Sequence, residues 1–371
     1  MPVAIFPFET SKTEFKAFLL YALFVAYGSV YPFEFRLEQA ASTGLWAVLS
    51  CPAGVSIGDT AANLVLFMPF GFLGVRAMKS PFKRFYYVAF ITLFCLPFSY
   101  LLQYAQIFIP ARVPSFLDVI LNTAGCTSAA VFGVVNRFRF FGGKRGVELW
   151  KSVPLLLTGL WLAGRLAPFL PSPDLGYIKD SLKPLLLHPH LSVFDALLHL
   201  AGWNTFGHMV STHTGKPLKP GVMLAAVLGV FCGQVVIVKR VLTLSDVVGG
   251  LAGVLMWTRL RRSRRPAHIL LALIVAVISV RGLLPFDLAV EGRNEFYWLP
   301  FYGFLAGDRL INICVLFEKM FLYGSLIWLL EEAGESWTRA VFLCLAWLGS
   351  IEFAQLWYNG HSPETTDLIV T

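Results

Sequence analysis

Charged residues are scarce in this chain of 371 residues: Asp, Glu, Lys and Arg make up only 14%, against about 25% in a typical soluble domain. Hydrophobic residues make up 57%, and the mean hydropathy is +0.68. A soluble protein of this composition could not cover its surface with polar atoms. The composition therefore excludes an ordinary soluble protein and predicts an integral membrane protein.

Metal sites and nucleic-acid surfaces also lack their usual signatures. The six Cys have no metal-ligand spacing and five lie inside apolar runs, so we expect packing residues rather than zinc ligands. The net charge of +8 comes from short basic clusters between apolar runs, without a basic patch interleaved with aromatic residues. We therefore expect no metal, no cofactor and no nucleic-acid partner, and leave protein partners open.

Apolar runs of about 17–25 residues recur along the chain, which is the length that a hydrocarbon core of about 30 Å requires. In lipid such runs must be helices, because unpaired backbone groups find no water there. The sequence predicts an all-α, polytopic transmembrane bundle with eleven full spans and the start of a twelfth at Asp367, which we expect to continue beyond Thr371. The eleven runs are 14–33, 59–77, 85–108, 116–136, 149–170, 192–211, 220–238, 244–260, 267–285, 308–330 and 339–357.

Lys and Arg gather in alternate loops between these runs. The clusters follow the second, fourth, sixth and eighth runs, and "RLRRSRRPAH" after the eighth is the densest. The positive-inside rule places these loops and the N-terminus in the cytoplasm. The loop after the tenth run is acidic instead, but acidic residues count little in this rule.

Three polar residues recur at fixed spacing while the residues between them differ. The stretches are "QIFIPARVPSFLD" from Gln106, "QVVIVKRVLTLSD" from Gln234 and "QLWYNGHSPETTD" from Gln355. Each starts with Gln, has a basic or imidazole residue six positions later, and ends with Asp after six more. The chain has only five Gln and nine Asp, so chance is a poor explanation and we interpret the pattern as an internal repeat.

Other features follow the same period. Pro-Phe pairs at Pro32, Pro168 and Pro285 close one apolar run in each repeat, and an Asp follows each proline by 23–27 residues. We predict three repeats of about four helices, at residues 1–145, 146–265 and 266–371, with the last lacking most of its fourth helix. An even helix count keeps all three in one orientation.

The predicted topology brings the repeated polar residues to the outer ends of the helices, where they face an extracytoplasmic mouth. Polar groups at membrane depth are costly and usually functional, so we predict a ligand site. A structural alternative stays open: Arg112 pairs with Asp118 or Asp59, and Gln106 binds a free carbonyl, to pin the corner between two helices. The predicted ligand-binding residues are Asp59, Asn63, Gln106, Arg112, Asp118 and Asn122 in the first repeat, Asp195, His199, Gln234, Arg240 and Asp246 in the second, and Asp308, Asn312, Gln355, His361 and Asp367 in the third.

Two further charges stand near the middle of the tenth run, at Glu318 and Lys319. A charge at this depth is a functional candidate by default. The alternative is an ion pair inside the bundle, with Arg165 or Glu352 as the expected partner.

The stretches "DTAANLVLFMPFGFLG" and "QYAQIFIPARVPSFLDVILNTAG" resemble the VanZ-like family of bacterial integral membrane proteins. The second and third repeats resemble it less, because His199 stands for Asn in one and His361 for Arg in the other. The shared residues in the first repeat are Asp59, Asn63, Phe67, Pro69, Gly71, Gln106, Arg112, Asp118, Asn122 and Gly125. The resemblance implies a cell-envelope role in the bacterial cytoplasmic (inner) membrane.

Three classes of function fit these observations. The first, which we favour, is binding or handling of an envelope lipid or glycolipid, with the membrane lipid as partner. The second is a membrane-embedded enzyme that acts on a lipid-linked phosphate or sugar, with carboxylates as acid and base and no catalytic residue assigned. The third is a structural subunit of an envelope assembly, for which the sequence offers no positive signal.

Overall fold

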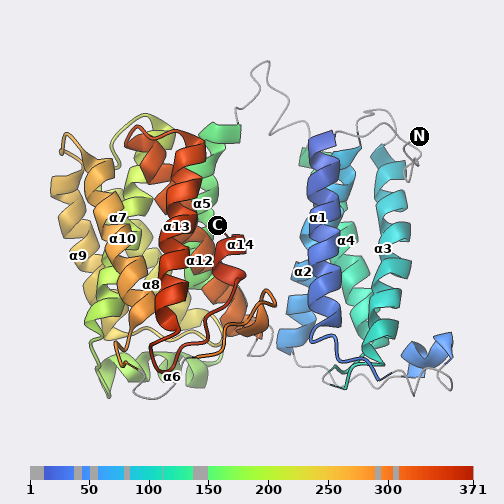
Figure 1. Cartoon of the computed structure of the whole chain (residues 1–371). Helices are drawn as coiled ribbons and strands as arrows, with labels where there is room; N and C mark the ends of the chain where they lie inside the picture. The colour runs from blue at the N-terminus through green and yellow to red at the C-terminus, as the bar shows by residue number, and fades with distance from the viewer. Residues whose placement is uncertain are drawn as a thin grey trace. The chain divides into compact units, whose positions relative to one another are not determined.

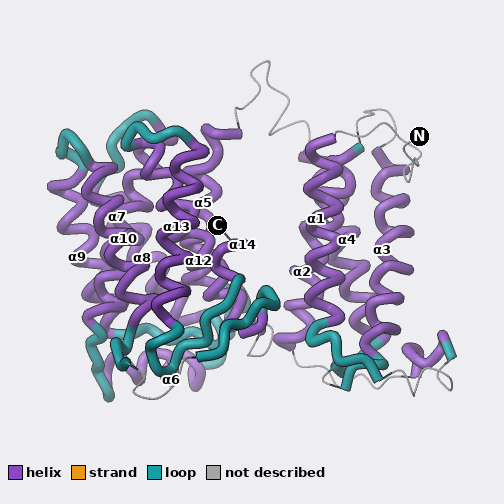
Figure 2. Tube along the Cα trace, in the orientation of Figure 1, coloured by secondary structure: helices purple, strands orange, loops and turns teal. Residues whose placement is uncertain are grey.

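The computed structural model describes residues 12–36, 44–50, 57–78, 84–110, 112–136, 149–288, 294–303 and 309–370. This part of the chain is built from helices joined by loops, and its only β-type pairs are isolated bridges (Figure 2). The chain forms two compact units, Met1–Gly146 and Val147–Thr371. The second unit contains the helices of both the second and the third predicted repeat.

The first unit is a bundle of four long helices and one short 3₁₀ helix (Figure 1). Aromatic rings fill its core, with Phe70 in contact with Phe18, Phe94 and Phe98. Its elements are α1 (Lys12–Val30), η2 (Leu45–Ser50), α2 (Ile57–Ala77), α3 (Arg84–Gln106) and α4 (Phe116–Asn136).

Helices α2 and α4 lie so close together that their backbones are in contact at two glycines. A Cβ atom on Gly71 would overlap the carbonyl oxygen of Cys126, and a Cβ atom on Gly125 would overlap that of Leu64. Glycine at both crossing points is therefore required by the packing, as at close helix crossings in membranes. This crossing fixes the start of α4, and with it Asp118 and Asn122, against the start of α2.

The second unit packs its helices around three fully buried tryptophans, Trp161, Trp203 and Trp257. Helices α7 and α9 pack together, as do α5 and α12 and also α7 and α10. The elements are α5 (Leu149–Leu166), α6 (Leu175–Leu186), α7 (Val193–Thr214), α8 (Pro220–Val236), α9 (Leu244–Leu260), α10 (Pro266–Leu283), α12 (Arg309–Glu332), α13 (Trp337–Gln355) and α14 (Thr366–Val370).

Each of the eleven predicted spans coincides with a helix over most of its length. Among the described residues, five segments are long and apolar enough to cross a membrane, which supports a membrane protein. The count of eleven crossings stays a prediction, since several helices are shorter or less apolar. The five segments are Phe85–Gln106, Phe116–Val135, Pro266–Leu283, Asn312–Glu332 and Trp337–Gln355.

Helix α6 lies across one end of the second unit and was not predicted (Figure 1). Asp174 caps its first turn by accepting a hydrogen bond from the Gly176 amide at 2.9 Å. The Tyr177 hydroxyl donates to the Ile237 carbonyl at 3.0 Å, which ties α6 to the loop after α8. At 12 residues the helix is too short to span a bilayer, so the length of an apolar run does not predict it.

Helices α1, α5 and α10 end in the same way, each with a cis X-Pro bond followed by Phe. The three phenylalanines, Phe33, Phe169 and Phe286, have φ values of 67°, 61° and 62°. Their amides donate to the carbonyl three residues back, at 3.0, 2.9 and 2.8 Å respectively. A positive φ is uncommon outside glycine, so three matching corners are a specific structural feature.

Candidate functional site

In the first unit, Gln106 and Arg112 hold the end of α1. The Arg112 guanidinium donates to the carbonyls of Tyr31 (Nε, 2.9 Å) and Gly28 (Nη2, 2.7 Å), and the Gln106 amide donates to the Ser29 carbonyl at 3.0 Å. The last carbonyls of a helix have no donor within the helix, so these bonds satisfy them. For Gln106 the structure matches the alternative in which it binds a free carbonyl.

Arg240 repeats this arrangement in the second unit. Its Nε and Nη2 donate, each at 2.6 Å, to the carbonyls of Ala167 and Gly164, which stand one and four residues before Pro168. Arg112 uses the carbonyls one and four residues before Pro32. Such charge-assisted bonds are about twice as strong as neutral ones.

Gln355 continues the pattern at the end of α10, where its amide donates to the Gly282 carbonyl at 2.8 Å. Gly282 stands three residues before Pro285, as Ser29 stands three before Pro32. His361, in the place of the arginines, is half-buried, and its Nε2 has no hydrogen-bond partner among the described residues.

A second polar row on α3 lies beside Asp118. Gln103 is buried, places its amide nitrogen 3.5 Å from Asp118 Oδ2, and accepts the Ser115 amide at 3.0 Å. The Asn122 amide donates to the Ser99 hydroxyl at 2.9 Å. Sequence analysis missed Ser99 and Gln103, although both share a helix face with Gln106 by their spacing.

The remaining predicted residues belong to α2 and α7 and to the start of α12, and each has different surroundings. Asp308 and the side chain of Asp59 lie outside the described residues. The Asn63 amide nitrogen is buried without a hydrogen-bond partner among those residues, whereas Asp195 is exposed in the first turn of α7. Asn312 lines a cavity of about 170 Å³ together with Lys319.

Asp246 is the centre of a buried network at the start of α9. Its Oδ2 accepts from the Thr243 backbone amide at 3.1 Å, and its own amide donates to the Thr243 hydroxyl oxygen at 3.1 Å, so the two residues form a capping box. Its Oδ1 lies 3.2 Å from His199 Nε2 and 3.4 Å from Gln234 Nε2. The structure thus brings together three predicted residues from α7, α8 and α9, and adds Arg165 of α5, with Nη1 at 3.9 Å from Asp246 Oδ1.

Glu318 joins α5, α10 and α12 through ion pairs with Arg165 and Arg281. The expected pair between Glu318 and Arg165 is confirmed. The Arg165 guanidinium also lies over the Trp161 ring, 4.6 Å from its centroid, a cation–π contact that stabilises a desolvated cation. Each charge in this network has an opposite partner, as charged groups inside an apolar environment require.

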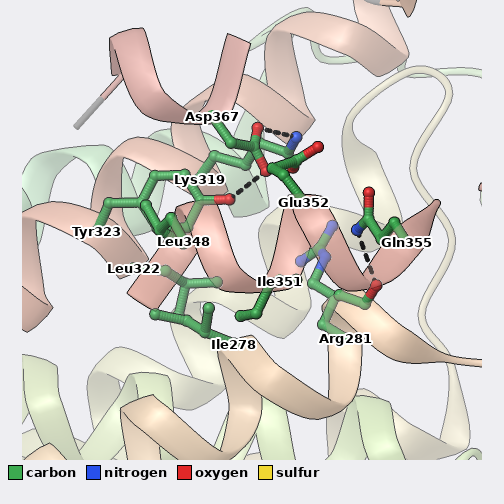
Figure 3. Close-up of a pocket in the computed structure, with 11 residues that line it drawn as sticks. Ile278, Arg281, Lys319, Leu322, Tyr323, Leu348, Ile351, Glu352, Gln355 and Asp367 are labelled. Carbon is green, nitrogen blue, oxygen red and sulfur yellow. Dashed lines mark hydrogen bonds and ion pairs between the residues drawn. The ribbon is translucent and has the colours of Figure 1, made fainter. Parts of the chain in front are cut away.

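Asp367, at the start of α14, anchors a second cluster (Figure 3). It forms an ion pair with Lys319 and accepts the Tyr323 hydroxyl at 2.7 Å. Glu352 of α13 lies beside it and accepts the Glu364 amide at 2.9 Å. Of these residues only Asp367 was predicted to bind a ligand. Lys319 was predicted as a charge near the middle of the tenth run, and Glu352 as a candidate ion-pair partner for the charges there.

A cavity of about 200 Å³ opens at this cluster. One wall is polar and includes Arg281, Lys319, Glu352, Gln355 and Asp367 (Figure 3). The other wall is apolar and is formed by Ile278, Leu322, Leu348 and Ile351. Both donors and acceptors face the space, so it suits a ligand with hydroxyl or mixed charged groups more than a bare anion.

The VanZ/LLP1 family model matches residues 18–137. No curated protein and no solved structure matches the chain. The matched segment contains most of α1 and all of α2, α3 and α4, with the Gly71–Gly125 crossing and the Gln106–Arg112 corner. Residues 18–137, and with them the first unit of the chain, are VanZ-like.

Proposed function

We propose that this chain is an integral membrane protein of the bacterial cell envelope that binds or handles an envelope lipid or glycolipid at a polar site on the extracytoplasmic side. The observation that carries the proposal is the cavity of about 200 Å³ with one charged wall and one apolar wall. An amphiphile has the same two faces, so its head group fits against Lys319 and Gln355 while its apolar part follows Leu322 and Ile351.

The volume of the cavity limits what it can enclose. Pockets that enclose whole small molecules measure roughly 300–1,000 Å³, so a space of about 200 Å³ holds a head group and only the start of the apolar part. The acyl chains then run from Leu322 and Ile351 out of the cavity and along the exposed apolar faces of the helices. This arrangement suits a membrane-resident ligand, because the exposed apolar helix faces can bind the acyl chains that the cavity cannot hold.

The existing ion pairs favour a head group rich in hydroxyls over a lone phosphate. Arg281 and Arg165 pair with Glu318, and Lys319 pairs with Asp367. A phosphate would have to displace one of these carboxylates, which leaves a buried charge without a partner. Sugar hydroxyls both donate and accept, so they can bind the carboxylates and the Gln355 amide without breaking a pair.

On the predicted repeat boundaries, every residue that lines the cavity belongs to the third repeat, which an ion pair joins to the second. We infer three tandem VanZ-like repeats, at 1–145, 146–265 and 266–371, from the matching helix corners at Phe33, Phe169 and Phe286 and from the equivalent bonds of Arg112 and Arg240. On this assignment Glu318 of the third repeat pairs with Arg165 of the second. The polar network of the second unit then belongs to both repeats.

Native mass spectrometry of the full chain, extracted from bacterial membranes, tests the binding function. We expect the wild type to retain a glycolipid, and Lys319→Gln to reduce the retained fraction severalfold, because the substitution removes a charged donor from the cavity. Lys183→Gln is the matched control, since Lys183 is 57% exposed on α6 and faces no described cavity. Retention that is equal in all three proteins, or that mirrors bulk lipid, contradicts the proposal.

An enzyme that acts on a lipid-linked phosphate or sugar is the second candidate. It is favoured by one observation: Glu352 and Asp367, with Tyr323, place acid and base groups in the same cavity. If Asp367→Asn still retains the lipid but no longer forms a product from it, the result supports the enzyme hypothesis. If the substitution abolishes lipid retention and the wild type forms no product, the result supports the binding hypothesis.

A further inference from the structure

Another cavity of the second unit lies where the end of α5 meets the loop after α8 and the first half of α12. Its volume is about 230 Å³, and its basic side chains are Arg165 of α5 and Lys239 and Arg240 of the loop. Glu318 of α12 is the one carboxylate among the described residues that line it. We call this space the basic cavity. Within the described part of the chain it shares no lining residue with the cavity of about 200 Å³.

The carboxylates near the basic cavity are fewer than the arginines. Glu318 forms ion pairs with both Arg165 and Arg281 of α10. Asp246 lies 3.9 Å from Arg165. Arg240 has no carboxylate within ion-pair distance among the described residues. In an apolar bundle a positive charge that lacks a counter-ion is costly, so the basic cavity favours an anion.

Two guanidinium nitrogens of the residues that line the basic cavity have no hydrogen-bond partner in the described structure. Arg165 Nε is buried and unbonded. Arg240 donates from Nε to the Ala167 carbonyl and from Nη2 to the Gly164 carbonyl, which leaves its Nη1 without a partner. Native proteins leave few buried donors unbonded, so these nitrogens indicate that the basic cavity binds an acceptor.

From these observations we propose that the basic cavity binds a phosphate group through Arg165, Lys239 and Arg240. Guanidinium groups bind phosphate by parallel hydrogen bonds, and a phosphate has enough oxygens for three cations, whereas a carboxylate has only two. Lys239 is exposed, so the group can enter from the surface. The group is either the head-group phosphate of a membrane lipid, for which basic pockets between membrane helices are typical sites, or inorganic phosphate.

The basic cavity differs from the cavity of about 200 Å³ in how it would receive an anion. There, Lys319 is paired with Asp367, so a phosphate would have to displace a carboxylate. Beside Arg240 no carboxylate has to leave. The phosphate site therefore does not depend on the glycolipid proposal.

Isothermal titration calorimetry of the full chain in a nonionic detergent tests the site with two probes, inorganic phosphate and a short-chain phosphatidic acid. We expect saturable binding of at least the phosphatidic acid, and weaker binding of the diacylglycerol with the same chains, because it lacks the phosphate. Lys239→Gln should weaken binding about fivefold, the effect of one basic residue near an anionic head group, and Lys239→Arg should preserve it. Lys216→Gln is the control, since Lys216 is exposed after α7 and lines neither cavity.

The wild type alone can overturn the proposal, by binding neither probe or by binding the diacylglycerol as tightly as the phosphatidic acid. Equal affinities of Lys239→Gln and Lys216→Gln also overturn it. If inorganic phosphate binds, free phosphate is a sufficient ligand; if only the phosphatidic acid binds, the ligand is a lipid head group. Because Lys319 is unchanged in every protein and no probe carries a sugar, the result is separate from the retention experiment, and either proposal can fail alone.

Discussion

Arg240 shows how a single residue secures the end of a helix in this protein. Its guanidinium satisfies two carbonyls at the end of α5, and its Nη2 also lies 2.8 Å from the Cys314 thiol of α12. Lysine carries the same charge but lacks the planar fork that reaches two carbonyls at once. The role therefore depends on the shape of the side chain as well as on its charge.

Arg240→Lys should lower the free energy of unfolding by about 1.5–3 kcal/mol, the loss expected for one hydrogen bond to a charged group. Thermal unfolding in detergent, followed by tryptophan fluorescence, measures the change. Arg259→Lys, at an exposed position in the last turn of α9, serves as the control and should leave the midpoint unchanged. Equal midpoints for the two variants would show that the bonds of Arg240 do not stabilise the bundle.

Among the substitutions considered, replacement of Glu318 should lower the free energy of unfolding most. Glu318→Gln leaves Arg165 and Arg281 without their shared anion, and breaking a buried pair from one side costs about 3–5 kcal/mol. We expect a large loss of folded protein during heating in detergent, measured by the fraction that stays monodisperse on size-exclusion chromatography.

The matched control for that variant is Glu335→Gln. Glu335 pairs with Arg339 at 3.8 Å, and both side chains are exposed, at 42% and 78%. Exposed pairs contribute about 0–1 kcal/mol, so this variant should behave as the wild type. If Glu318→Gln is as stable as Glu335→Gln, the network of the second unit is not a structural requirement.

At the scale of elements, the crossing of α2 and α4 is the feature that shapes the first unit. Gly71 and Gly125 let the two backbones touch, and this contact sets where α4 begins. Asp118 at the start of α4 and Asn63 at the start of α2 are therefore positioned by glycines about two helical turns away.

Gly125→Ala should separate α2 from α4 and destabilise the first unit by about 1–3 kcal/mol, the usual cost of overpacking. Gly229→Ala in α8 is the control, since a Cβ there meets no atom within 4 Å. Alanine in an open helical position is expected to stabilise slightly. Thermal midpoints of the two variants, compared in the same detergent, provide the measurement; a midpoint for Gly125→Ala at or above that of Gly229→Ala would contradict the close crossing.

At the scale of the whole molecule, the predicted orientation can be tested through α7. Lys183 in α6 precedes this helix, and Lys216 follows it. The positive-inside rule predicts that the first lies outside the cell and the second inside. A membrane-impermeant thiol reagent applied to intact cells should label Lys183→Cys but not Lys216→Cys, each in a variant without other cysteines; the reverse labelling would invert the topology.

The helices themselves were predictable from sequence, because a bilayer allows little else for long apolar runs. The meeting of His199, Gln234 and Asp246 also follows from the predicted topology. In contrast, the sequence could not show that the carbonyl bound by Gln106 is that of Ser29, because this pairing depends on the ends of α1 and α3 lying side by side. Glu352 escaped selection as a site residue because the residues at the equivalent position, Gln103 and Phe231, are of different types, and its place in the cavity depends on how α14 folds back against α13.

The central claim, that a lipid head group occupies the cavity with its apolar part along Ile351, is tested most directly by site-specific photo-crosslinking. A benzophenone amino acid in place of Ile351 lies on the apolar wall, while the same amino acid in place of Ile269 lies on α10 in a different cavity, outside the polar cluster. The account predicts a covalent glycolipid adduct at position 351 that is lost with Lys319→Gln, and only bulk-lipid adducts at position 269. The same mixture of bulk lipids at both positions, unaffected by Lys319→Gln, would contradict it.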